Sequence, residues 1–149
     1  MISKILVPTD GSKAAQKAAR YAVNLAKQLK ASIVALSVID KRPFLAQTIP
    51  ASDTVWHVIE PIEDYLCEAA EQYAEEIKML CDKNHIRSKV VITKGHPVEE
   101  IIKEAERLKV SLIIMGSHGR SALAAMVLGS VTHGVIHKGT KIPVMVVKG

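Results

Sequence analysis

Short apolar runs alternate with amphipathic segments along the whole chain, and this alternation limits the fold more than any other feature. The runs span residues 5–7, 33–38, 90–92, 112–115 and 144–147. Most contain no polar residue, which is typical of strands that are covered on both faces of a parallel sheet. The amphipathic segments between them span residues 15–29, 62–80, 98–108 and 129–138. This order predicts an α/β fold in which parallel strands are joined by helical crossovers.

The residues that precede these segments are typical of helix starts. Ser12 is a suitable N-cap for the first helix, and Pro61 and Pro97 stand where prolines favour the first turn of the second and third. Residues 40–60 have no clear periodicity and form a longer connection than most compact domains contain. We therefore expect one domain over residues 1–149, with a long loop or lid over residues 40–60.

Composition narrows the classes of partner. The net charge is +5, but lysines and arginines are scattered and aromatic residues make up only 3%, so we expect no nucleic-acid partner. The first apolar run begins too close to Met1 for a signal peptide, and no apolar stretch approaches the ~20 residues of a membrane helix. Cys67 and Cys81 are too far apart on one helix to bridge. We expect a cytoplasmic protein with reduced thiols and no membrane partner.

Two loops carry the candidate chemistry. In an open α/β sheet, ligands bind beyond the carboxyl ends of the strands, where the strand order reverses. Residues 8–12 follow the first strand, and residues 116–121 follow the fourth. In the second loop, Gly116 and Gly119 permit turns and close approach that a Cβ would block. Gly129 then opens a helix whose free N–H groups attract anions. Together these features predict a phosphate site.

Several side chains near these loops suit a nucleotide. Ser130 and Thr132 can donate hydroxyl hydrogen bonds, and Arg120 can add positive charge. Asp10 can accept from ribose hydroxyls or hold a magnesium ion on the phosphates, although it suits a turn or a helix cap equally well. His118 can touch a phosphate or simply lie on the loop surface. The chain has neither a Walker loop with its lysine nor a G-x-G-x-x-G fingerprint.

The sequence supports neither a zinc site, nor a hydrolase triad, nor a receiver domain. His133 and His137 have the i, i+4 spacing that can bind zinc, but no third ligand is evident, so we expect solvent-facing or interface histidines. A G-x-S-x-G elbow is missing, which leaves a hydrolase triad without support. A receiver domain would need an aspartate at the end of the third strand, where Thr93 stands.

The glycine spacing carries a resemblance to a known family. Gly116-x-x-Gly119, nine further residues, and Gly129-Ser130 resemble the nucleotide motif of the universal stress protein family, in its ATP-binding branch. Residues 5–12, 37–40 and 143–147 resemble the same family in the same order, so the resemblance covers essentially the whole chain. One departure is Ala122, where family members often carry glycine.

The resemblance implies both a fold and a site. The fold is an open, Rossmann-like, five-stranded parallel sheet in the order 3-2-1-4-5, with helices on both faces. The adenosine side of the site would be lined by Pro8, Thr9, Asp10, Val38, Met115 and Gly116. The ribose and phosphates would be held by Gly119, Gly129, Ser130, Val131 and Thr132, with His118 and Arg120 beside them. The cofactor would be ATP, or AMP or ADP, with magnesium or manganese on the phosphates.

We therefore expect an adenine-nucleotide-binding regulatory or stress-response protein. The order 3-2-1-4-5 leaves the strand over residues 143–147 at a sheet edge, where an apolar strand invites pairing, so we expect a homodimer. Two alternatives stay open. One is a slow ATPase or phosphotransferase in which Asp10 and a metal promote attack on the γ-phosphate. The other is an interaction module that keeps the fold without a nucleotide.

Overall fold

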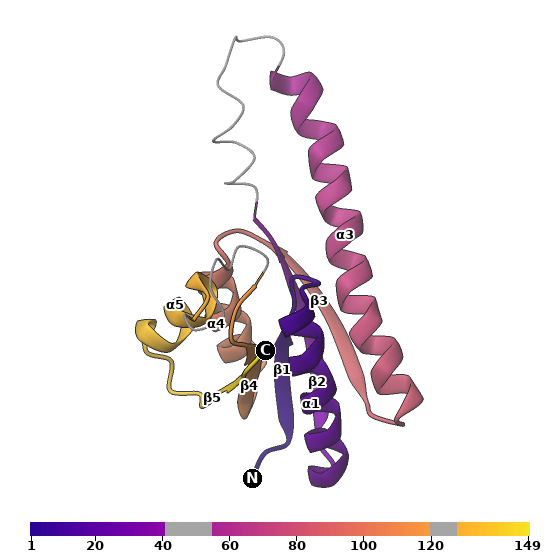
Figure 1. Ribbon diagram of the computed structural model, residues 1–149, viewed down its shortest axis with the longest axis vertical. Coiled ribbons are helices and arrows are strands. Elements are labelled where there is room, and N and C mark those ends of the chain that lie inside the picture. Colours follow the sequence, from indigo (N-terminus) through magenta and orange to yellow (C-terminus); the bar gives the residue numbers. More distant parts are fainter. Residues whose placement is uncertain (41–54, 120–127) are drawn as a thin grey trace.

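The computed structural model describes residues 1–40, 55–119 and 128–149, and strands alternate with helices along these ranges (Figure 1). The elements are β1 (Lys4–Pro8), α1 (Lys13–Leu29), β2 (Ser32–Ile39), α3 (Val55–Lys83), β3 (Ser88–Lys94), α4 (Pro97–Arg107), β4 (Leu112–Gly116), α5 (Ser130–Lys138) and β5 (Val144–Val147).

All the strands are parallel and form one sheet in the order β3-β2-β1-β4-β5. The predicted fold class and strand order are confirmed. Because β1 lies between β2 and β4, the chain reverses its direction of travel across the sheet there. This reversal opens a crevice beyond the carboxyl ends of β1 and β4, the place where such sheets bind ligands.

Helices cover both faces of the sheet, as continuously apolar strands require. On one face, α1 and α3 pack against side chains such as Ile5, Val7 and Ile33. On the other, α4 and α5 pack against Leu6, Leu36 and their neighbours. The N-terminal part of α3 extends past the carboxyl ends of the strands (Figure 1). This helix therefore overhangs the edge at which the crevice opens.

The helix starts agree with two predictions and correct a third. The Ser12 hydroxyl accepts the Ala15 N–H at 3.1 Å, and α4 begins at Pro97, both as predicted. However, α3 begins at Val55, so Pro61 lies inside the helix and residues 55–60 are helical where a loop was expected. A proline removes only one N–H from a helix, and α3 continues on both sides of that gap. Residues 41–54, the remainder of the expected loop after residue 40, lie outside the described residues.

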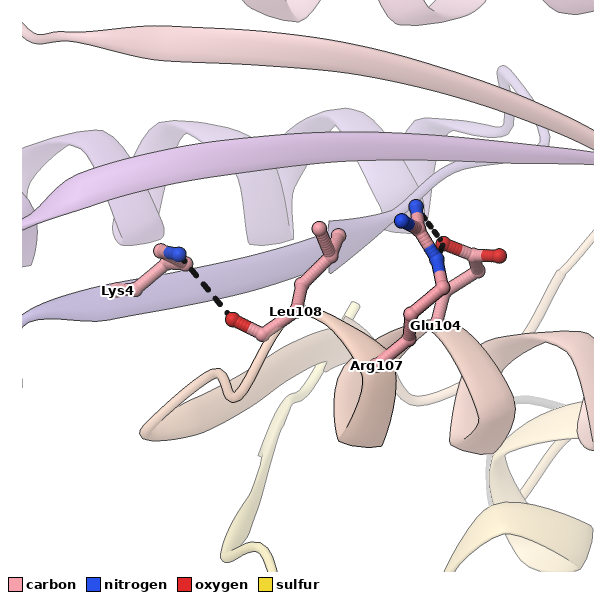
Figure 2. A network of polar contacts seen from close by, with 4 residues as sticks. All are labelled: Lys4, Glu104, Arg107 and Leu108. Carbon is pink, nitrogen blue, oxygen red and sulfur yellow. Dashed lines mark hydrogen bonds and ion pairs between the residues drawn. The ribbon is translucent and has the colours of Figure 1, made fainter.

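The C-terminal turn of α4 makes one polar contact within the helix and another, just after it, to the sheet (Figure 2). The Glu104 carboxylate is buried and accepts two hydrogen bonds from the Arg107 guanidinium, at 2.6 and 2.9 Å. These charge-assisted bonds offset the desolvation of the carboxylate and raise the pKa of Arg107 above its usual value. One turn further on, Lys4 of β1 donates to the Leu108 carbonyl at 3.1 Å. The C-terminus of α4 is thereby joined to the start of β1.

Two further expectations concern the whole chain. Both cysteines are free thiols, as predicted; Cys67 is half-buried and Cys81 fully buried on α3. Within the described ranges, no helix is both long enough and apolar enough to cross a membrane.

Candidate functional site

A cavity of about 490 Å³ opens at the carboxyl ends of β1, β2 and β4, beside the start of α5. The structure brings together in its lining every sequence-predicted site residue that it describes. Arg120 lies outside the described residues, and so does Ala122. The predicted residues in the lining are Pro8, Thr9, Asp10, Val38, Met115, Gly116, His118, Gly119, Gly129, Ser130, Val131 and Thr132.

The turn between β1 and α1 forms one wall and is held by its own polar groups. Thr9 is buried; its N–H donates to the Leu36 carbonyl at 2.8 Å, and its hydroxyl accepts the Gly11 N–H at 3.1 Å. Asp10 Oδ1 accepts the Ser12 N–H at 3.0 Å. Asp10 therefore shapes the turn while it also lines the cavity. The structural and ligand-facing roles proposed for this carboxylate are compatible.

The three spaced glycines make room for the protein's own chain. A Cβ on Gly116 would lie 2.9 Å from the carbonyl of Ala14, and a Cβ on Gly119 would meet the Asp10 carboxylate. A Cβ on Gly129 would lie 2.9 Å from the Cα of His118. None of the three has a positive φ, so close approach rather than a special turn requires glycine here. The glycines let α1, the loop and α5 pack closely around the cavity.

The start of α5 has the features of an anion site. Its N-cap, Gly129, makes no side-chain capping bond, whereas Ser12 caps α1 and His96 caps α4. The first N–H groups of this nine-residue helix therefore have no capping side chain among the described residues. They lie at the positive end of the helix dipole and at the cavity wall.

The hydroxyl groups of Thr132 and Ser130, near the start of α5, have different surroundings. Thr132 is buried and donates its hydroxyl to the Gly116 carbonyl at 2.8 Å, so this proton already has a protein acceptor. Contrary to the expectation of a hydroxyl donor to phosphate, Thr132 instead joins α5 to the end of β4. Ser130 is exposed at the helix start and lines the cavity, and hydrogen bonding of its hydroxyl to a phosphate stays a prediction.

Ser117 was missed by the sequence analysis although it stands inside the loop. Its N–H donates to the Val147 carbonyl at 3.0 Å, and its carbonyl accepts the Gly129 N–H at 2.7 Å. Its hydroxyl accepts the Gly149 N–H at 3.1 Å and lies 3.0 Å from Nδ1 of His118. Only the fold reveals this role, because the partners come from three separate segments of the chain.

Helix α3 supplies a wall that the sequence reasoning also missed. Its overhanging part contributes side chains that share one helical stripe: Tyr65, Leu66, Ala69, Ala70 and Tyr73. Tyr73 packs over Gly11, whose φ is +77° and whose absent Cβ leaves room for the ring. The stripe was visible in the sequence, but periodicity alone does not tell which end of the sheet a helix covers.

The lining also includes residues next to those predicted. Ser37, Ile39 and Asp40 flank Val38 at the end of β2, in a run that the family resemblance had already marked. The remaining members are Ala15, Leu36, Pro97 and Ile101.

The histidine pair on α5 is separate from this cavity. The rings of His133 and His137 stack with centroids 5.5 Å apart, and both side chains are exposed. Within the part of the chain that the structure describes, no group of three or more His, Cys, Asp or Glu side chains is placed to hold a metal ion.

A comparison with protein families finds a match that covers nearly the whole chain. The universal stress protein family model matches residues 1–148. The chain belongs to this family. Universal stress protein MJ0577 of Methanocaldococcus jannaschii is 39% identical over 157 aligned residues, which cover 99% of this chain and 96% of that protein. Universal stress protein MJ0531 of the same organism is 35% identical, covering 99% of this chain and 83% of its own length.

Solved structures give the same universal stress fold. The structure of MJ0577 superposes with a TM-score of 0.84 at 36% identity, covering 100% of this chain and 97% of that one. Two more distant chains contain nucleotides. One is a universal stress protein in complex with cAMP, at 21% identity, TM-score 0.68 and coverage of 97% and 96%. The other is an Arabidopsis thaliana family protein with AMP bound, at 16% identity, TM-score 0.67 and coverage of 97% and 90%. At these identities the likeness establishes the fold.

Proposed function

We propose that this universal stress protein binds an adenine nucleotide, ATP by preference, in the cavity beyond β1 and β4. The observation that carries the proposal is the convergence of the predicted residues. They come from four separate chain segments and line one cavity of about 490 Å³. That volume is within the usual range for a small-molecule site. Distant members of the fold that hold cAMP and AMP are in keeping with it.

The two ends of the cavity suit the two ends of a nucleotide. The uncapped start of α5 offers N–H groups to phosphates, and Gly119 brings the loop backbone close to it. The apolar side chains of Val38 and Met115, with the α3 wall, suit a purine base. Asp10 lies beside Gly119 in the same lining, where its carboxylate can accept from ribose hydroxyls.

A magnesium ion would come with the phosphates rather than with a protein cage. Asp10 is the carboxylate beside Gly119 in the loop after β4, which we call the phosphate loop, and magnesium commonly binds through one carboxylate together with phosphates and water. The residues present therefore fit a metal carried by ATP, which would neutralise part of the phosphate charge.

The test is calorimetric titration of ATP into a matched pair of glycine variants. Gly129→Ala places a methyl group 2.9 Å from His118 Cα and displaces the phosphate loop from α5. We expect it to weaken ATP binding at least tenfold. Gly134→Ala makes the same change five residues later, where the methyl group meets Val98 of α4 at 2.6 Å. We expect this control to lower the melting temperature and to retain ATP affinity.

Two results would contradict the proposal. One is the absence of ATP binding by the unmodified protein at millimolar concentration. The other is equal ATP affinity in folded Gly129→Ala and in the unmodified protein. Mass spectrometry of the ligand that copurifies with the native protein would show whether ATP, ADP or AMP is bound. Rapid steady-state release of phosphate would instead favour the ATPase alternative.

We also propose that two copies pair through β5. This strand is the last in the sheet order and hydrogen-bonds to β4 on one side only. Its residues, Val144–Val147, are all apolar and all half-buried. A second copy with the same edge would satisfy the outer backbone groups and cover the side chains by twofold symmetry.

A further inference from the structure

Ser117 is fixed in place by its main chain before its side chain is considered. It follows β4 directly and is only 8% exposed. Its N–H is bonded to Val147 at the end of β5, and its carbonyl to Gly129 at the start of α5. The serine Cα is thus held between an edge strand and the helix start at which phosphate is expected.

The Ser117 hydroxyl has two polar neighbours but one hydrogen. One lone pair of Oγ accepts the Gly149 N–H at 3.1 Å. Nδ1 of His118 lies 3.0 Å from the same oxygen. A hydroxyl has one donor hydrogen and two acceptor lone pairs, so donating to Nδ1 uses the hydrogen while Oγ still accepts from Gly149. Oγ has a second lone pair and could accept from Nδ1–H instead, but the hydrogen of this serine, which is only 8% exposed, would then lose its acceptor at Nδ1. Donation from Oγ to Nδ1 is therefore the favoured arrangement, and it makes Nδ1 the acceptor nitrogen of the ring.

The role of Nδ1 determines whether a hydrogen is bound to Nε2, the other ring nitrogen of His118. A neutral imidazole carries its hydrogen on one nitrogen only, so an acceptor Nδ1 requires a hydrogen on Nε2. Gly149 also packs against the ring, because a Cβ there would lie 2.7 Å from Cε1 and 3.4 Å from Nε2 of His118. His118 lines the cavity, and its Cα lies against Gly129 at the start of α5. The ring of this cavity-lining residue is therefore held beside Gly149, and Nε2 is the nitrogen left to carry the hydrogen.

We propose that Ser117 is a positioning residue that fixes the tautomer and orientation of His118, making Nε2–H a donor to the nucleotide phosphates. The inference rests on the proposed function and adds to it a residue that the glycine motif does not contain. With the opposite tautomer, Nε2 would present a lone pair to phosphate oxygens, which also carry only lone pairs.

The first test is a double-mutant cycle with Ser117→Ala and His118→Ala, titrated with ATP and with adenosine. Each single variant should weaken ATP binding by about tenfold, the usual effect of losing one hydrogen bond to a charged group. The double variant should bind ATP no more weakly than His118→Ala, because Ser117 acts through His118. Adenosine, which has no phosphate, should bind all of them within about twofold of the unmodified protein.

Two further variants separate positioning from general structure. Ser117→Thr keeps the hydroxyl and should retain ATP binding. Ser111→Ala removes a serine hydroxyl at the opposite end of β4, where Oγ accepts the Ser3 N–H at 3.1 Å, and should leave ATP affinity unchanged. Melting temperatures of all variants are measured alongside.

The second test needs no variant. Nitrogen-15 spectra of the unmodified protein in alkaline buffer should show His118 with its hydrogen on Nε2, and Ser117→Ala should alter that signal. A hydrogen on Nδ1 would overturn the inference, as would additive losses in the cycle or an equal loss of adenosine affinity. These results leave the proposed function intact if ATP still binds. Absence of ATP binding by the unmodified protein would overturn both proposals.

Discussion

Asp10 both shapes a turn and lines the cavity, and a different carboxylate oxygen serves each role. Oδ1 accepts the Ser12 N–H at 3.0 Å and shapes the turn that leads into α1. Oδ2 is the atom that a Cβ on Gly119 would meet, so it faces the phosphate loop. A substitution that keeps one oxygen and removes the charge therefore separates the two roles.

Asp10→Asn should weaken ATP binding by about tenfold while the melting temperature without ligand stays close to that of the unmodified protein. The amide oxygen can still accept from Ser12, whereas a charge-assisted contact to ribose or metal is lost. Asp10→Ala, which loses both, should also lower the melting temperature. Calorimetry and thermal unfolding of the two variants check this. Unchanged ATP affinity in Asp10→Asn would assign the residue to the turn alone.

Cys81 should be the slower of the two thiols to react. It is fully buried on α3, and desolvation raises the pKa of its thiol to about 11. At neutral pH it is therefore protonated, and the thiolate is the reactive form. A thiol reagent should label half-buried Cys67 first and reach Cys81 only on unfolding. Mass spectrometry of partially labelled protein checks the order, and equal labelling rates in the native state would contradict it.

The Cys81 thiol also makes the free energy of unfolding depend on pH in a predictable direction. Folding favours the protonated Cys81 thiol, because its folded pKa of about 11 is above the ordinary value of about 8.5. Its stabilising effect is therefore fully present below about pH 8.5. The effect is lost progressively as the pH rises toward 11. Cys81→Ala should reduce the fall in unfolding free energy across that range, measured with urea at each pH.

At the scale of elements, β5 is the place where a single side chain can test pairing. Met145 and Val147 pack against the core beneath α1, and Val144 packs on the opposite face. Val146 belongs to neither cluster of packed side chains. A charge at Val146 therefore disturbs the strand edge with least damage to the core.

Val146→Asp should convert a dimer into a monomer, because symmetric pairing would bring two carboxylates into one apolar interface. Lys89→Asp is the matched control, since it changes the charge of an exposed residue of β3, at the opposite edge of the sheet. Sedimentation at micromolar concentration distinguishes the outcomes. A monomeric unmodified protein would refute the dimer, and so would a dimer that tolerates Val146→Asp.

The elements also show what periodicity can and cannot predict. Continuous apolar runs located the strands, and Ser12 and Pro97 located two helix starts, because these signals act within a few residues of their cause. The start of α3 was predicted wrongly, since Pro61 was taken as a first-turn proline and lies inside the helix. The α3 wall and the Ser117 contacts were missed because their partners are distant in sequence.

At the scale of the whole molecule, the strand order was predictable because the family resemblance fixed it and every crossover could be right-handed. The same order explains why the glycine spacing located the site: β1 and β4 become neighbours only at the reversal point. Spacing alone did not reveal why the glycines are needed. Their neighbours, such as Ala14 beside Gly116, are known only once α1 is packed.

ATP should stabilise the entire fold rather than one loop, since the cavity is lined by β1, β2, α3, β4 and α5 together. A ligand that binds only the native state adds about 2.7 kcal/mol at a hundredfold excess over Kd. The melting temperature should therefore rise steadily with the logarithm of ATP concentration. Gly134→Ala should start from a lower temperature and show the same increment. A melting temperature that is independent of ATP would contradict this prediction.

The two outer strands of the sheet differ in charge, and under the proposed pairing this difference would limit how many copies can associate. The free edge at β3 carries exposed Lys89 and Lys94, whereas β5 carries no charged residue. Edge lysines discourage strand addition. If two copies pair through β5 as proposed, both apolar strand edges are covered, and the sheet edges left exposed are the two β3 strands with their lysines. Under the proposed pairing we therefore expect assembly to stop at two copies rather than to extend strand by strand into a fibre.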